Sequence, residues 1–99
     1  MQAELRQSAP GAWQVIGSVT LQTATELLEL PGPAAGNGEL YIDWSRVEVV
    51  DSAAVALMIE WLRQARQADV RLRFSGLSAP LRNLLQVFDL DAPLAGVLA

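Results

Sequence analysis

The feature that most constrains the fold is a helical segment set between two strand-like segments. Residues 51–68 carry apolar side chains at helical spacing, and their start holds Asp51 and Ser52, residue types that cap helices. Residues 40–42 before the helix and residues 70–74 after it have the composition of strands. A strand, a helix and a second strand joined by short connections predict a parallel crossover and therefore an α/β layered fold.

Two flanking regions extend this alternation. Residues 13–19 are rich in β-forming side chains, and residues 4–7 can pair with them through the turn sequence Ser-Ala-Pro-Gly, so we expect a hairpin at the amino end. Toward the carboxyl end, Ser78 and Pro80 precede leucines at helical spacing, which predicts an amphipathic helix of about three turns. The hairpin adds strands to the sheet, and the helix adds to its cover.

A further helix is expected after the hairpin. Thr23 and Glu26 have the spacing at which two side chains satisfy free backbone amides at a helix start. Apolar residues follow until Pro31, where the helix should end because proline has no amide hydrogen. Together the elements predict an α/β fold in a single domain, residues 1–99, with a mixed sheet of four or five strands packed against three or more helices.

The composition excludes several kinds of function. The chain has no cysteine and no histidine, so disulfides, thiol or imidazole zinc sites and Ser-His or Cys-His catalysis are excluded. Its seven basic residues are all arginine, and a net charge of -4 argues against binding to nucleic acid. We find no signal peptide and no apolar run long enough to cross a bilayer, so we expect a cytoplasmic protein without direct membrane insertion.

The surface of the central helix carries the main functional signal. Its second half has a polar stripe at helical spacing, formed by Glu60, Arg63, Gln64 and Gln67. Carried back toward the helix start, the same period passes through Leu57, Ala56, Ala53 and Ser52. The first two turns are therefore predicted to present an apolar face to solvent.

Two interpretations of this apolar start remain open. In the first, other parts of the chain bury it, and its alanines are small because a strand or loop approaches closely. In the second, it is a docking surface for a partner protein. There Ala53 and Ala56 would admit the partner backbone, and Leu57 would be the apolar anchor. Ser52 and Glu60 would complete the contact surface.

Three polar residues near this helix each have a structural and a chemical interpretation. Ser52 can be a helix cap, or a phosphoacceptor whose phosphate would place about two negative charges on the apolar face. Asp43 and Asp51 can support the turn and the helix start, or serve acid-base chemistry or Mg²⁺ binding. Because the sequence has no histidine and no phosphate loop, we favour the supporting role and expect no catalysis, no metal and no cofactor.

One part of the sequence resembles a known family. Residues 42–57 are similar to the strand-to-helix signature of STAS domains, in which Asp, an apolar residue and Ser precede a later Asp and a Ser or Thr that opens a helix. These positions are Asp43, Trp44, Ser45, Asp51 and Ser52. Residues 17–30 resemble the preceding strand and first helix of the family. The resemblance implies a mixed sheet with helices against it, no enzymatic activity, and function through the helix that starts at Ser52.

Two branches of that family fit the sequence. In anti-sigma-factor antagonists, the serine matching Ser52 is phosphorylated by a partner kinase that is itself the anti-sigma factor, and the phosphate blocks binding. In the MlaB-like branch, a short STAS protein binds the ATPase of the Mla phospholipid ABC transporter, which maintains outer-membrane lipid asymmetry.

The choice between the branches depends on the residues after Ser52. Ala53 and Ala54 depart from the Ser and Gly that are common in the antagonists, and residues 55–61 look closer to MlaB-like proteins. The resemblance therefore favours a subunit held at the inner membrane by its ATPase partner, with the antagonist as the alternative. The implied contact residues are Ser52, Ala53, Ala56, Leu57 and Glu60.

Overall fold

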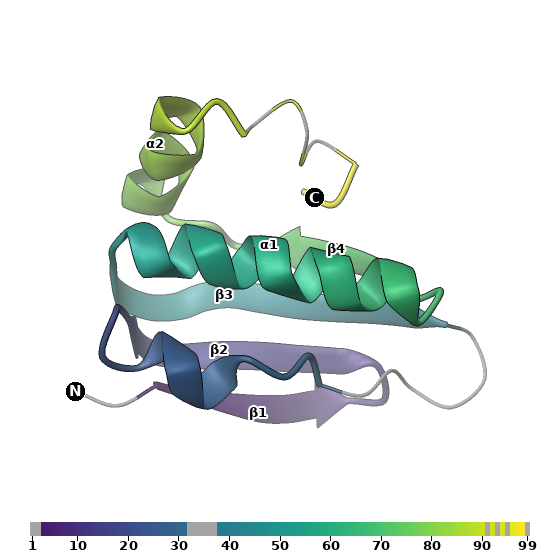
Figure 1. Ribbon diagram of the computed structural model, residues 1–99. Coiled ribbons are helices and arrows are strands. Elements are labelled where there is room, and N and C mark those ends of the chain that lie inside the picture. Colours follow the sequence, from purple (N-terminus) through teal and green to yellow (C-terminus); the bar gives the residue numbers. More distant parts are fainter. Residues whose placement is uncertain (1–2, 32–37, 91, 93, 95, 99) are drawn as a thin grey trace.

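The sheet is built around one long strand, β3 (Glu39–Val50), which has a parallel neighbour on each side. The computed structural model describes residues 3–31, 38–90, 92, 94 and 96–98. Its sheet has the order β1-β2-β3-β4 (Figure 1). β1 (Ala3–Ala9) pairs antiparallel with β2 (Ala12–Val19), while β2, β3 and β4 (Arg71–Ser75) run parallel. The predicted mixed sheet and amino-terminal hairpin are confirmed.

One face of this sheet is covered by α1 (Ser52–Gln67), which crosses in front of β3, and by η1, a single 3-10 turn (Ala24–Leu27) (Figure 1). The remaining helix, α2 (Ala79–Val87), packs against α1. The core between α1 and the sheet holds Trp44, Trp61 and Phe74, whose ring centroids lie 5.9 to 6.4 Å apart. These rings are fully buried, so they fix α1 firmly on the sheet.

The expectation of three or more helices is wrong for the described residues, which form two α-helices and the four-residue turn η1. The reason lies in Thr23. Its buried hydroxyl donates to the carbonyl of Ser18 at 2.7 Å and accepts from the amide of Thr20 at 3.0 Å. Because this side chain bonds back toward β2, it does not cap the following turn, and the predicted capping pair with Glu26 does not form.

β3 is longer than the sequence indicated. The prediction limited this strand to residues 40–42 and treated the valines after it as a connection, but β3 continues to Val50 because it pairs with β2 from Tyr41 to Val50. Asp43 and Asp51 are therefore eight positions apart along an extended chain, roughly 26 Å. The two carboxylates do not meet at one end of the sheet.

Asp43 has a local role instead. Its carboxylate accepts hydrogen bonds from the amide and the hydroxyl of Ser45, at 2.9 and 3.0 Å. A Cβ atom built on Gly76 would lie 2.5 Å from Asp43 Oδ1, so the chain leaving β4 passes directly against this pair. The predicted support of the helix start by Asp43 is therefore wrong.

The helix boundaries follow the sequence signals closely. α1 begins after Asp51, and α2 begins after Ser78, whose hydroxyl accepts a hydrogen bond from the amide of Leu81. Pro80 occupies the first turn of α2, where its missing amide hydrogen costs nothing. Among the described residues, the longest helix has 16 residues, and none combines the length and the hydropathy needed to cross a membrane.

Candidate functional site

Asp51 organises the start of α1. Its Oδ1 atom accepts a hydrogen bond from the amide of Ala53 at 2.8 Å, which caps the helix. Its Oδ2 atom accepts from the amide of Leu21 at 3.1 Å. One carboxylate therefore fixes both the first turn of α1 and the segment that leads into η1. The predicted role of Asp51 at the helix start is confirmed.

Because Asp51 is the cap, Ser52 has a different position from the one that a capping serine takes. It is the first residue of α1, and its side chain is exposed to solvent. Its hydroxyl makes no hydrogen bond to any part of the chain that the structure describes. Ser52 thus presents a free hydroxyl at the positive end of the α1 dipole.

The solvent-facing side of the first two turns of α1 differs from the predicted side by about one residue position. Ser52, Ala56 and Ile59 are exposed, and Ala53 is half-buried. Leu57 is only 1% exposed, so its predicted role as an outward anchor is wrong. The outer line of the helix runs through Ser52, Ala56, Ile59 and Arg63, which are three or four residues apart.

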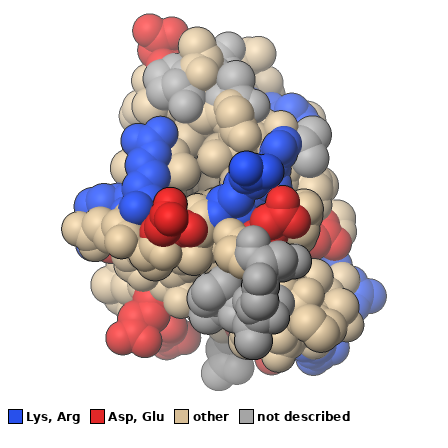
Figure 2. All heavy atoms as spheres, turned by 90° about the vertical axis from the view of Figure 1, so that its right-hand side faces the viewer, with Lys and Arg blue, Asp and Glu red and all other residues tan. Residues whose placement is uncertain are grey.

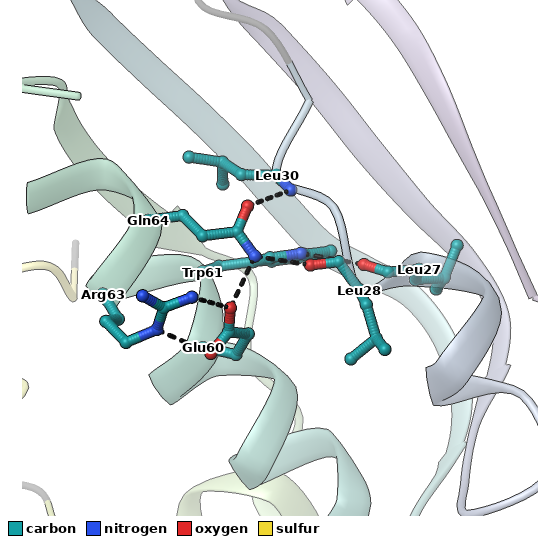
Figure 3. A network of polar contacts seen from close by, with 7 residues as sticks. All are labelled: Leu27, Leu28, Leu30, Glu60, Trp61, Arg63 and Gln64. Atoms are coloured by element: carbon teal, nitrogen blue, oxygen red, sulfur yellow. Dashed lines mark hydrogen bonds and ion pairs between the residues drawn. The ribbon is translucent and has the colours of Figure 1, made fainter. Parts of the chain in front are cut away.

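The cause of this rotation is the segment that follows η1 (Figure 3). The side-chain amide of Gln64 accepts from the amide of Leu30 and donates to the carbonyl of Leu28, both at 2.8 Å. Trp61 Nε1 donates to the carbonyl of Leu27 at 2.9 Å. The polar side chain of Gln64 therefore turns toward residues 27–30 and not toward bulk water. The prediction located the solvent-facing side of α1 from its polar residues. Because the polar Gln64 bonds to Leu28 and Leu30, this placed the solvent-facing side too close to η1.

Glu60 belongs to the same network. It accepts hydrogen bonds from Arg63 Nε and Nη2, at 2.9 and 2.6 Å, and from Gln64 Nε2 at 2.7 Å. These bonds, first those from Arg63 and then the one from Gln64, lower the pKa of the Glu60 carboxyl from 4.5 to about 2. Glu60 is therefore a fixed negative charge whose hydrogen-bonding capacity is largely used within the chain.

Two open grooves border the start of α1. The first lies between α1 and the segment around η1, and it is lined by Leu21, Ala24, Thr25, Leu28, Ala53, Ala56, Leu57 and Glu60. The second lies between α1 and the end of α2, and it is lined by Ser52, Val55, Ala56, Ile59, Phe88 and Leu90. Ala56 lines both, so the two grooves meet at this small side chain. Figure 1 shows the corresponding arrangement, with η1 and α2 on opposite sides of the first turns of α1.

Large apolar side chains remain exposed along both grooves. Leu21 is 73% exposed, and Leu28, Ile59 and Phe88 are between 44% and 48% exposed. We call the surface that they form the apolar face, defined by Leu21, Leu28, Ala53, Ala56, Ile59 and Phe88, with Ser52 at its rim. Of the five predicted contact residues, this surface brings together Ser52, Ala53 and Ala56, borders Glu60, and leaves Leu57 in the floor of the first groove.

Four residues of the apolar face were not predicted. Ile59 could have been found, because Ser52, Ala56 and Ile59 follow the helical period. Leu21, Leu28 and Phe88 come from other elements, and their meeting depends on how η1 and α2 pack beside α1. Within the described residues, no group of three or more acidic side chains is arranged to hold a metal ion.

Comparison with known proteins places this geometry in a family. A family model described as "Mlab, STAS domain" matches residues 4–98. The chain belongs to this STAS family. No curated protein matches the sequence. A solved structure titled "Structure of the Anti-Sigma Factor Antagonist SpoIIAA in its Unphosphorylated Form" is similar with a TM-score of 0.59 and 14% identity, covering 85% of this chain and 81% of that one.

At that identity the similarity to the antagonist structure concerns the fold. It supports a STAS arrangement of sheet and helices, in agreement with the strand-to-helix signature around Asp51 and Ser52. The segment that resembles the strand-to-helix signature therefore lies at the point where the apolar face begins. STAS domains generally interact with partner proteins. The apolar face is an exposed apolar surface beside the start of α1.

Proposed function

We propose that this STAS domain is a non-enzymatic subunit that binds the ATPase of an Mla-type phospholipid ABC transporter. The contact is made by the apolar face, and the ATPase holds the subunit at the cytoplasmic side of the inner membrane. The transporter moves phospholipid and maintains the lipid asymmetry of the outer membrane. The observation that carries this proposal is the apolar face itself, which the fold leaves open although it is built from three separate segments.

The apolar face has the composition of a protein contact. Contiguous exposed apolar surface on a soluble domain marks an interaction site. Complete burial of one leucine, isoleucine or phenylalanine side chain contributes about 1.5–3 kcal/mol before ordering costs. Ala53 and Ala56 are small, so a partner backbone can approach α1 between the larger side chains that border the two grooves.

The same surface offers little for catalysis. Asp51 is engaged by two backbone amides, and Glu60 is engaged by Arg63 and Gln64. The pKa of Glu60 is lowered, so this carboxyl is a poor proton donor or acceptor near neutral pH. These properties favour a binding role over an enzymatic one.

The test of this function is co-purification with the ATPase. Ala56→Glu places a charge at the centre of the apolar face, whereas Gln67→Glu places the same residue at an exposed position in the last turn of α1. We expect Ala56→Glu to abolish co-purification and Gln67→Glu to preserve it. Retention of the ATPase by folded Ala56→Glu would show that the interface lies elsewhere.

A second candidate function is supported by Ser52. Its free, exposed hydroxyl could accept a phosphoryl group from ATP bound to a kinase, releasing ADP and the hydroxyl proton. A phosphate there would be stabilised by the α1 dipole and would place about two negative charges at the rim of the apolar face, which would repel an apolar partner. This is the chemistry of an anti-sigma-factor antagonist.

The two candidates differ in an intact-mass measurement. After incubation with a cognate anti-sigma kinase and ATP, the antagonist function requires a chain heavier by one phosphoryl group, and Ser52→Ala should prevent the gain. An unchanged mass with every kinase encoded beside the chain would eliminate this candidate.

A further inference from the structure

The margins of the apolar face carry negative charge on both sides. On the η1 side, Glu26 and Glu29 are exposed, and on the α2 side Asp89 is exposed directly after Phe88. None of these three carboxylates forms an ion pair with another described residue. They differ in this from Glu60, whose charge is paired with Arg63.

The local geometry places these carboxylates outside the grooves. Thr25 and Leu28 line the first groove, whereas the residues that directly follow them, Glu26 and Glu29, are exposed and do not line it. Asp89 has a left-handed backbone with φ of 58° and ends α2 beside the second groove. A path across the face from Leu28 over Ala56 to Phe88 therefore has an exposed carboxylate directly next in the chain at each end, Glu29 after Leu28 and Asp89 after Phe88.

Arginines occur near both ends of α1, since Arg82 is exposed on α2 and Arg63 pairs with Glu60 on α1. Arg66 is in its last turn, and Arg71, at the start of β4, faces Glu39 at 3.6 Å. Figure 2 looks at this end and shows basic and acidic side chains side by side. The carboxylates of Glu29 and Asp89 therefore have no ion-pair partner among the described residues, whereas Glu39 at the far end of α1 is paired with Arg71.

We propose that the segment of the ATPase that occupies the apolar face has apolar side chains at its centre and arginine or lysine side chains at both ends. This inference rests on the proposed function and specifies the chemistry of the partner. The segment crosses α1 over Ala56, places one apolar side chain in each groove, and brings its basic ends to Glu29 on one side and to Asp89 on the other. Charge complementarity of this kind raises the association rate and sets the orientation of the complex.

The test measures affinity for the purified ATPase by calorimetry at about 0.05 M and about 0.5 M NaCl, because salt screens exposed charges. We expect high salt to weaken the wild-type complex about tenfold. Glu29→Arg should weaken it about tenfold at low salt, and Asp89→Asn about threefold, with little difference from wild type at high salt. Glu4→Arg is the matched control, since Glu4 is exposed on the edge strand β1, and it should bind as wild type does.

The results distinguish a failure of the inference about basic ends from a failure of the proposed function. If Ala56→Glu abolishes binding while Glu29→Arg and Asp89→Asn bind normally, the apolar face is the interface and the inference about basic ends is wrong. If wild type does not bind the ATPase, the proposed function fails. In that case two synthetic peptides with the same leucine-rich centre are titrated, one with arginine ends and one with glutamate ends. Selective binding of the arginine peptide, lost in Glu29→Arg, supports the inference, and equal or absent binding overturns it.

Discussion

The two halves of α1 use their side chains in opposite ways. In the second half, Glu60, Trp61 and Gln64 bond to one another or to residues 27–30, so its polar groups serve the fold. At the start of the first half, the cap residue Asp51 accepts from the amides of Ala53 and Leu21, and beyond it Ala56 and Ile59 face solvent. The second half of α1 therefore holds residues 27–30 through Trp61 and Gln64, and we call these contacts the clamp. The first half is an open surface.

This difference shows that the exposed apolar surface is positioned by contacts made elsewhere in the molecule. The clamp in the second half holds residues 27–30 against α1, and this position presents Leu28 beside Ala56. The polar half of the helix thus shapes the groove that the apolar half lines. A change in either half should be visible in a different property, stability for the clamp and partner binding for the open surface.

The largest expected effect comes from comparing a buried and an exposed residue within the first half of α1. Leu57 and Ala56 are neighbours, but Leu57 is 1% exposed and Ala56 faces solvent. Leu57→Asp should lower the free energy of unfolding by more than about 3 kcal/mol, because it buries a carboxylate without a partner. Ala56→Asp should change it by less than about 1 kcal/mol. Urea denaturation measures both, and equal losses would mean that Ala56 is buried as well.

A smaller effect is expected in the clamp. Gln64→Ala removes the partners of the Leu28 carbonyl and the Leu30 amide, so we expect a loss of about 1–2 kcal/mol in unfolding free energy. Hydrogen exchange at the Leu30 amide should become faster in the same variant. Gln67→Ala is the control, because Gln67 is exposed in the adjacent turn and should be replaceable at little cost. An unchanged exchange rate at Leu30 would contradict the clamp.

The smallest effect concerns the charge of Glu60. Its pKa is lowered from 4.5 to about 2 in the folded chain, so ionised Glu60 stabilises the fold fully above pH 4.5. This contribution should be lost as the pH falls from about 4.5 to about 2. Comparing urea midpoints of wild type and Glu60→Gln over this range isolates the effect, which should be absent from the variant. Parallel pH profiles for the two proteins would show that Glu60 is not specifically stabilised.

The sequence predicted the features that depend on local chemistry. The start of α1 at Asp51 or Ser52, of which Asp51 is the cap, the bounds of α1, the alternation in β4 and the start of α2 at Ser78 follow from interactions within a few residues. The errors arose where distant segments meet. The length of β3 is set by its pairing with β2. Thr23 does not cap η1 because its hydroxyl donates to the carbonyl of Ser18.

The candidate site was predictable to the same extent. Ser52, Ala53 and Ala56 were found because they share one side of one helix. Leu57 was misplaced because Gln64, a polar side chain used as a guide, bonds to a neighbouring segment of the chain, and Glu60 bonds to Gln64. The sequence near α1 could not predict that Leu28 and Phe88 line the grooves, because each lies beside α1 only through the packing of another element.

The most direct test of the account is a cysteine footprint of α1 in the complex. The chain has no cysteine, so Ala56→Cys and Gln67→Cys each introduce a unique exposed thiol, one in each half of the helix. Alkylation rates are read from the intact mass of this chain with and without the ATPase. We predict that the ATPase slows alkylation at position 56 at least about tenfold and leaves position 67 unchanged. Equal rates at position 56 with and without a bound ATPase, or protection at position 67 alone, would contradict the claim that the open start of α1 is the interface.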